Sequence, residues 1–123
     1  AYDSAFGHSA GTFRGGNGND KIVGGSASEI IYGGSGDDII YGGGGDNKLF
    51  GGKGYDNFHL DPFGGFTTVM DFEKGFDTVH LGEGSSISAM HIGTATYFFQ
   101  GLDHFGTVED AYLTETESGL WTI

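Results

Sequence analysis

Between residues 15 and 59, an apolar side chain recurs at every ninth position, in a short segment that follows a glycine-rich stretch. Because side chains alternate between the two faces of a strand, a three-residue strand centred on that position turns one apolar side chain inward. The glycines allow the tight turn with positive φ that precedes each strand. The pattern predicts five short strands, with inward side chains at Ile22, Ile31, Ile40, Leu49 and Phe58.

Two consecutive units are expected to form one eighteen-residue coil of a solenoid, with loops at both edges and a thin core between two strands. Successive coils would stack at about 4.8 Å, the spacing of neighbouring strands. The loops of residues 15–20, 33–38 and 51–56 then share one edge, called here the odd edge. The loops of residues 24–29 and 42–47 share the opposite, even edge.

The flanking residues are expected to close the two ends of this stack. Residues 6–14 read as a degenerate copy with Phe13 inward and no acid, which predicts a capping coil. Alternating segments at 94–99, 111–116 and 119–123 predict antiparallel strands. Five inward residues bury too little to stand alone, so this tail is expected to fold onto the stack. We expect one domain over 1–123, divided into 1–14 (cap), 15–59 (repeats) and 60–123 (C-terminal cap).

Composition and charge exclude several classes of function and of stabilising group. The chain has 123 residues, 26 glycines, no cysteine and a formal charge of −12. Such an acidic surface disfavours nucleic acid as a partner. Without cysteine there are no disulfides and no thiolate metal sites. No stretch approaches the ~20 apolar residues of a membrane span. Metal ions held by oxygen ligands remain as a means of stabilising a small domain.

The sixth position of each unit carries the candidate metal ligand. The units read GGNGNDKIV, GGSASEIIY, GGSGDDIIY, GGGGDNKLF and GGKGYDNFH. This pattern, G-G-x-G-x-D-x-U-x, resembles the calcium-binding nonapeptide of the RTX family. After the last unit, residues 71–79 (DFEKGFDTV) resemble the segment that follows the repeats in many RTX proteins.

The resemblance implies an all-β, right-handed parallel β-roll that binds about 2–4 Ca²⁺ ions. It also implies a secreted, extracellular protein that is exported by type I secretion machinery and folds on binding Ca²⁺. Two adjacent loops would offer about six oxygens, from carbonyls and the sixth-position carboxylates, which suits Ca²⁺ better than Mg²⁺.

Carried onto this chain, the family pattern gives an intact odd edge and an altered even edge. The odd-edge ligands are expected to be Gly16, Gly18 and Asp20 with Gly33, Ser35 and Asp38, and then Gly34, Gly36 and Asp38 with Gly51, Lys53 and Asp56. A third odd-edge site would use Gly52, Gly54 and Asp56 with Asp71 and Asp77, unless these two acids only cap the roll. The even-edge candidates are Gly25, Ala27 and Glu29 with Gly42, Gly44 and Asn47. Because Asn47 is uncharged and Glu29 is longer than Asp, that site is expected to be weak or hydrated.

Other chemistry finds little support in the sequence. No H-E-x-x-H or G-x-S-x-G motif is present, so no catalytic residue is expected. A protease, lipase or epimerase could lie elsewhere in a parent protein. Aromatic side chains at position nine predict outward ladders on both sheets, such as Tyr32 with Phe50 and Tyr41 with His59. These could bind a glycan or protein ligand, so a carbohydrate-binding or adhesion module is the alternative function.

Overall fold

The computed structural model describes residues 11–24, 28–60, 65–73, 76–81, 87–93, 95–100, 103–109, 113–115 and 120–122. Within these ranges, every helix or strand element is a β-strand, and the strands form two sheets. The expected ligands Gly25 and Ala27, and most of the predicted N-terminal cap, lie outside the described residues. No helix in the described part of the chain is long and apolar enough to cross a membrane.

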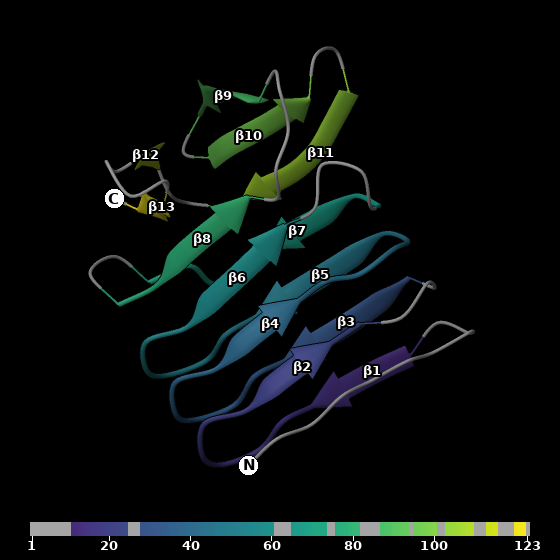
Figure 1. Cartoon of the computed structure of the whole chain (residues 1–123), viewed down its shortest axis with the longest axis vertical. Coiled ribbons are helices and arrows are strands. Elements are labelled where there is room, and N and C mark those ends of the chain that lie inside the picture. Colours follow the sequence, from purple (N-terminus) through teal and green to yellow (C-terminus); the bar gives the residue numbers. More distant parts are fainter. Residues whose placement is uncertain are drawn as a thin grey trace.

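Short parallel strands stack up the length of the molecule, with loops on both sides (Figure 1). The larger sheet has the order β1-β3-β5-β7-β11-β10-β9. Its strands are β1 (Gly11–Arg14), β3 (Glu29–Tyr32), β5 (Asn47–Phe50), β7 (Thr67–Val69), β9 (Ile87–Ile92), β10 (Ala95–Gln100) and β11 (Asp103–Val108).

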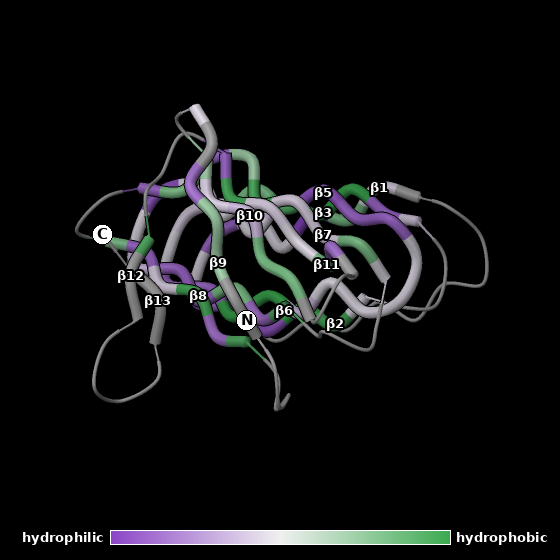
Figure 2. The backbone as a smooth tube through the Cα atoms, turned by 90° about the horizontal axis from the view of Figure 1, so that it is seen from above, coloured by the Kyte–Doolittle hydropathy of each residue, from purple (hydrophilic) through white to green (hydrophobic). Residues whose placement is uncertain are grey.

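The smaller sheet lies opposite the first, and the two layers are seen edge-on in Figure 2. Its order is β12-β13-β8-β6-β4-β2. Its strands are β2 (Lys21–Val23), β4 (Ile39–Tyr41), β6 (Asn57–Leu60), β8 (Thr78–Leu81), β12 (Thr114–Glu115) and β13 (Leu120–Thr122).

Strand pairing in the repeats follows the expected eighteen-residue coil. In the smaller sheet, Ile22 pairs with Ile40 and Ile40 pairs with Phe58, always in parallel. In the larger sheet, Ile31 pairs in the same way with Leu49. The predicted parallel β-roll is therefore confirmed, and so is the separation of the loops into two edges.

The core lies between the two sheets and is built from the eighth positions of the repeats. All five predicted inward side chains are buried, with exposed fractions of 0–1%. Val69 and Val79 continue the two rows beyond the last repeat, at the positions that pair with Leu49 and Phe58. At the N-terminal end, β1 pairs with β3, and Phe13 packs against the same core.

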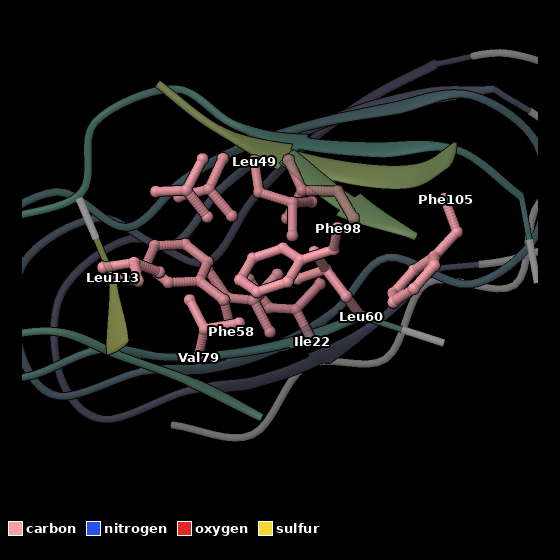
Figure 3. Packing of buried hydrophobic residues seen from close by; sticks show 12 residues of the cluster. Ile22, Leu49, Phe58, Leu60, Val79, Phe98, Phe105 and Leu113 are labelled. Atoms are coloured by element: carbon pink, nitrogen blue, oxygen red, sulfur yellow. The ribbon is translucent and has the colours of Figure 1, made fainter. Parts of the chain in front are cut away.

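The C-terminal segment completes this core. Phe98, Phe105, Val108 and Leu113 are buried in one cluster with the repeat side chains, and Figure 3 shows Phe98 packed beside Phe58. β11 extends the larger sheet beside β7 in parallel, and then β10 and β9 follow as antiparallel neighbours.

In the smaller sheet, β13 pairs antiparallel with β8 and β12 pairs with β13. The predicted antiparallel cap is therefore confirmed. The sequence predicted β10, β12 and β13 but gave no prediction for β9 or β11.

Candidate metal centre

The sixth-position aspartates form a buried ladder along the odd edge. The backbone N–H of Asp20 donates to Asp38 Oδ1 at 2.9 Å, and that of Asp38 donates to Asp56 Oδ1 at 3.0 Å. Asp56 N–H in turn donates to Asp77 Oδ1 at 3.0 Å. All four residues are at most 2% exposed. The repeat therefore places one buried carboxyl group on every coil of this edge.

The second oxygen of the shared aspartates has a different environment. In the part of the chain that the structure describes, no donor reaches the buried Asp38 Oδ2 or Asp56 Oδ2. Both oxygens lie beneath the first glycine of their own loop. A Cβ placed on Gly33 would lie 2.7 Å from Asp38 Oδ2 and 2.8 Å from the carbonyl oxygen of Gly51 in the next coil. A carboxylate oxygen and a carbonyl oxygen thus border the same small space.

The odd-edge loops also stack the glycines at positions two and four of their repeats. Gly16, Gly18, Gly34 and Gly36 all have positive φ, between 90° and 101°. A Cβ on Gly34 would overlap the Gly16 carbonyl oxygen, and one on Gly36 would overlap that of Gly18. These carbonyl oxygens therefore point from one coil towards the next. Gly52 and Gly54 continue this arrangement in the third loop, where Gly51 lies against Asp56 Oδ2 and the Lys53 side chain is exposed.

Burial makes the charged form of these carboxyl groups unfavourable. It raises the pKa of Asp38 to about 6, and the charge of Asp20 adds to the rise. Burial, with the charges of Asp77, Asp38 and Asp71, raises the pKa of Asp56 to about 8. The pKa of Asp77 is raised to about 6, again mainly by burial. In each case the backbone hydrogen bonds oppose the shift only in part.

A divalent cation with oxygen ligands fits this edge. Stacked carboxylates repel one another in a buried setting, and a cation between coils removes that repulsion. The donor set is carboxylate and carbonyl oxygen, which is the chemistry of Ca²⁺. Among the described residues, no three His, Cys, Asp or Glu side chains converge as a metal-binding group. The candidate ligands thus depend on the backbone as much as on side chains.

Asp71 and Asp77 occupy different places at the end of the odd edge. Asp71 Oδ1 accepts from Gly51 N–H at 2.7 Å, and its Oδ2 accepts from Gly52 N–H at 2.9 Å. Asp77 is the fourth rung of the ladder, and its Oδ2 accepts from Glu73 N–H at 2.8 Å. Asp71 therefore caps the third loop, whereas Asp77 has the position of a sixth-position aspartate.

The even edge shows a different set of contacts. Glu29 and Asn47 are both buried, and Glu29 N–H donates to Asn47 Oδ1 at 3.0 Å. The Asn47 amide donates to the carbonyl oxygens of Gly42 at 2.8 Å and Gly44 at 2.9 Å. The structure thus brings Glu29, Gly42, Gly44 and Asn47 together, but an amide nitrogen faces the carbonyl oxygens.

The odd edge carries a second, outer ladder that was not predicted from the sequence. Asn19 Oδ1 accepts from Asp37 N–H, and Asp37 Oδ1 accepts from Tyr55 N–H, both at 2.8 Å. Its signal was a short polar residue at the fifth position of repeats one and three. This ladder fixes the register of the loops from their exposed side.

The position-nine side chains stack on one another outside both sheets. Tyr32 and Phe50 are 4.7 Å apart between ring centroids, and the Arg14 guanidinium lies 4.7 Å above the Tyr32 ring. On the smaller sheet, Tyr41 stacks on His59 at 4.2 Å, and His59 stacks on His80 at 4.5 Å. Burial lowers the pKa of His59 to about 4, helped by the neighbouring His80.

Comparison with known proteins agrees with this geometry. The family model of the RTX calcium-binding nonapeptide repeat (4 copies) matches residues 10–28 and 23–58. No curated protein matches the sequence. Among solved structures, the chain is similar to a subunit of the mannuronan C5-epimerase of Azotobacter vinelandii, determined in solution. The identity is 27% and the TM-score is 0.53, over 94% of this chain and 70% of that one.

Proposed function

We propose that this chain, which carries calcium-binding RTX repeats in a β-roll, folds when it binds extracellular Ca²⁺ and thereby supports the type I secretion, folding and stability of a secreted bacterial protein. The observation that supports this most is the buried aspartate ladder of the odd edge. Asp38 and Asp56 each turn one buried oxygen, without a hydrogen-bond donor among the described residues, towards the backbone of the stacked loops.

The ladder links metal binding to folding. Without a cation, the folded state must either hold several stacked charges or keep carboxyl groups protonated against their normal preference. In the unfolded chain the same groups are hydrated and ionised. The free energy of binding Ca²⁺ therefore becomes free energy of folding.

This linkage suits export followed by folding outside the cell. In a cytosol with little free Ca²⁺ the chain stays unfolded and can pass through a secretion channel. Extracellular calcium modules have dissociation constants of about 10⁻⁴–10⁻³ M, which matches millimolar Ca²⁺ outside the cell. The domain itself then needs no catalytic residue, and any enzymatic activity belongs to another part of a parent protein.

The ions are expected to lie between the stacked odd-edge loops. Asp38 would contribute to two sites, one formed with the first loop and one with the third. We assign Asp77 to the third site, with Gly52, Gly54 and Asp56, and we assign Asp71 to capping of the loop. Two or three ions on this edge fall within the expected range of about 2–4.

Circular dichroism tests the proposal directly. We expect little β-structure in EGTA, recovery of the full signal at millimolar Ca²⁺, and a much weaker response to Mg²⁺ at the same concentration. Asp38→Ala should abolish the response or shift its midpoint strongly, whereas Asp46→Ala, at an exposed even-edge position, should not. Full β-structure in EGTA would refute calcium-driven folding.

The carbohydrate-binding alternative has less support. Sugar rings stack on free aromatic faces, but the faces of Tyr32, Phe50, Tyr41 and His59 are turned towards one another at 4.2–4.7 Å. These ladders therefore serve the packing of neighbouring coils. The similar solved structure is a subunit of an epimerase that acts on mannuronan. Its name describes that whole enzyme and does not say that this subunit binds the carbohydrate.

A further inference from the structure

The fourth repeat replaces the sixth-position carboxylate with an amide, and the amide has a defined orientation. Asn47 Oδ1 faces the N–H of Glu29 at 3.0 Å, so this atom must be an acceptor. Nδ2 faces the carbonyl oxygens of Gly42 and Gly44 at 2.8 and 2.9 Å, with Gly43 O farther away at 3.4 Å. The opposite orientation would set donor against donor and acceptor against acceptor.

Asn47 Nδ2 occupies the place that Asp38 Oδ2 has in the preceding odd-edge repeat. Both atoms lie beneath the first glycine of their own loop. A Cβ on Gly33 would be 2.7 Å from Asp38 Oδ2, and one on Gly42 would be 3.3 Å from Asn47 Nδ2. The other terminal atom of each side chain accepts an N–H from the coil before it.

The two edges carry opposite hydrogen-bonding groups beneath the first glycine of the loop, an acceptor on the odd edge and a donor on the even edge. On the odd edge, the carboxylate oxygen has no donor among the described residues and needs a cation beside it. On the even edge, an N–H donor is already within hydrogen-bond distance of the loop carbonyls. Gly42 O also lies close to Glu29, since a Cβ on Gly24 would meet both Gly42 O and Glu29 Oε1. The carbonyl that could serve a metal ion beside Glu29 is therefore already bound to the amide.

We propose that the N–H groups of the Asn47 side-chain amide do for this loop what a calcium ion does on the odd edge. The loop of residues 42–47 is then closed by hydrogen bonds and binds no metal. This inference rests on the proposed calcium role of the odd edge and adds that the two edges differ in kind. One edge of the roll is held by Ca²⁺, and the other is held by a group that is part of the chain and is always present.

The experiment compares Asn47→Asp, Asn47→Ala and Lys48→Gln with the unaltered chain. Bound Ca²⁺ per chain is measured by equilibrium dialysis and elemental analysis at saturating Ca²⁺, together with the melting temperature. Asn47→Asp should bind one more ion, because it restores the carboxylate opposite the loop carbonyls. Lys48→Gln changes the net charge by the same amount at the adjacent exposed position and should bind the same number as the unaltered chain.

Asn47→Ala removes the donors without adding a ligand. We expect an unchanged number of ions and a melting temperature lower by several degrees. Three results would overturn the inference: loss of an ion in Asn47→Ala, an unchanged melting temperature in that variant, or no additional ion in Asn47→Asp. If the unaltered chain binds no Ca²⁺ at all, the proposed calcium function fails. That failure is seen in the unaltered chain, whereas failure of the inference is seen in the Asn47 variants.

Discussion

At the scale of single residues, the odd edge depends on carboxyl groups that are hard to ionise in the folded, metal-free chain. Asp56 is the extreme case, with a pKa of about 8 that is raised by burial and by the charges of Asp77, Asp38 and Asp71. In the unfolded chain such a group titrates near its ordinary pKa of about 4. The difference makes the stability of the metal-free fold depend on pH.

The sign of this dependence is set by proton uptake. Between pH 4 and 8 the folded state binds more protons at Asp56 than the unfolded state, so stability without metal is lost as pH rises through this window. His59 acts in the opposite sense, but only below about pH 6.5, where its unfolded form gains a proton. We therefore expect the small amount of β-structure that remains in EGTA to decrease from pH 6.5 to 8.5.

The measurement is far-ultraviolet circular dichroism at the two pH values, with and without saturating Ca²⁺. Asp56→Asn should remove most of the pH dependence in EGTA, because an amide does not titrate. With Ca²⁺ bound, the signal should be nearly constant. A signal in EGTA that increases with pH would contradict the prediction.

Gly36 gives a second prediction at this scale. Its φ of 101° is unfavourable for any other residue, and a Cβ would also overlap Gly18 O. Gly16 has a similar φ of 90°, but a Cβ there would meet nothing within 4 Å. Gly16→Ala should therefore cost about 1–2 kcal/mol from the backbone alone. Gly36→Ala should cost about 1–3 kcal/mol more from the steric overlap. Equal losses in chemical denaturation with Ca²⁺ would show that the coils are not packed so closely.

At the scale of strands and loops, the nine-residue period was enough to predict the roll. Each eighth position had to turn inward once positions seven and nine turned out, so the buried rows followed from the spacing of Ile22, Ile40 and Phe58. The period could not predict the role of Asn47, because hydrogen-bond direction depends on which atom of the amide faces the loop. Nor could it place β11 beside β7, because the pairing of Val108 with Val69 joins segments without a shared repeat.

The cap of the third loop gives a prediction at this scale. Asp71 accepts hydrogen bonds from two successive N–H groups that no further repeat is present to satisfy. Asp71→Ala should lower the free energy of unfolding by about 2–4 kcal/mol, since bonds to a charged acceptor are worth about 1.5–3 kcal/mol each. Asp71→Asn keeps one acceptor and should lose less.

Asp46→Asn removes the same charge from an exposed position and is the control for Asp71→Asn. Chemical denaturation at saturating Ca²⁺ measures all three variants. A loss in the control as large as that in Asp71→Asn would mean that net charge, rather than the two hydrogen bonds, matters at this end of the roll.

At the scale of the whole molecule, the roll and the C-terminal strands share one core. Phe98 and Val108 are fully buried with Phe58 and Leu49, and the larger sheet of the roll continues into the strands that carry them. The repeats supply only one inward apolar side chain per nine residues, so much of the bulk of this core comes from outside them. Calcium binding and cap docking should therefore occur in one cooperative transition.

Phe98→Ala tests this coupling. It should lower the free energy of unfolding by about 3–5 kcal/mol and raise the Ca²⁺ concentration needed for half-maximal folding. Met90→Ala, at a position that is 52% exposed, should change stability by no more than about 0.5 kcal/mol. Thermal unfolding followed by circular dichroism should show a single transition in both. Two separate transitions, or an unchanged calcium midpoint in Phe98→Ala, would mean that the roll folds independently of its cap.

The alternation of loops between two edges also limits how such a gene can grow. Duplication of an eighteen-residue unit, such as residues 33–50, would add one complete coil and leave every later loop on its original edge. Duplication of nine residues would move all later loops to the opposite edge. Asp56 and Asp77 would then lie on the even edge, after Glu29 and Asn47, and the run of aspartates would be divided between the two edges. Insertions of odd multiples of nine should therefore be selected against, and the roll is expected to lengthen in steps of eighteen.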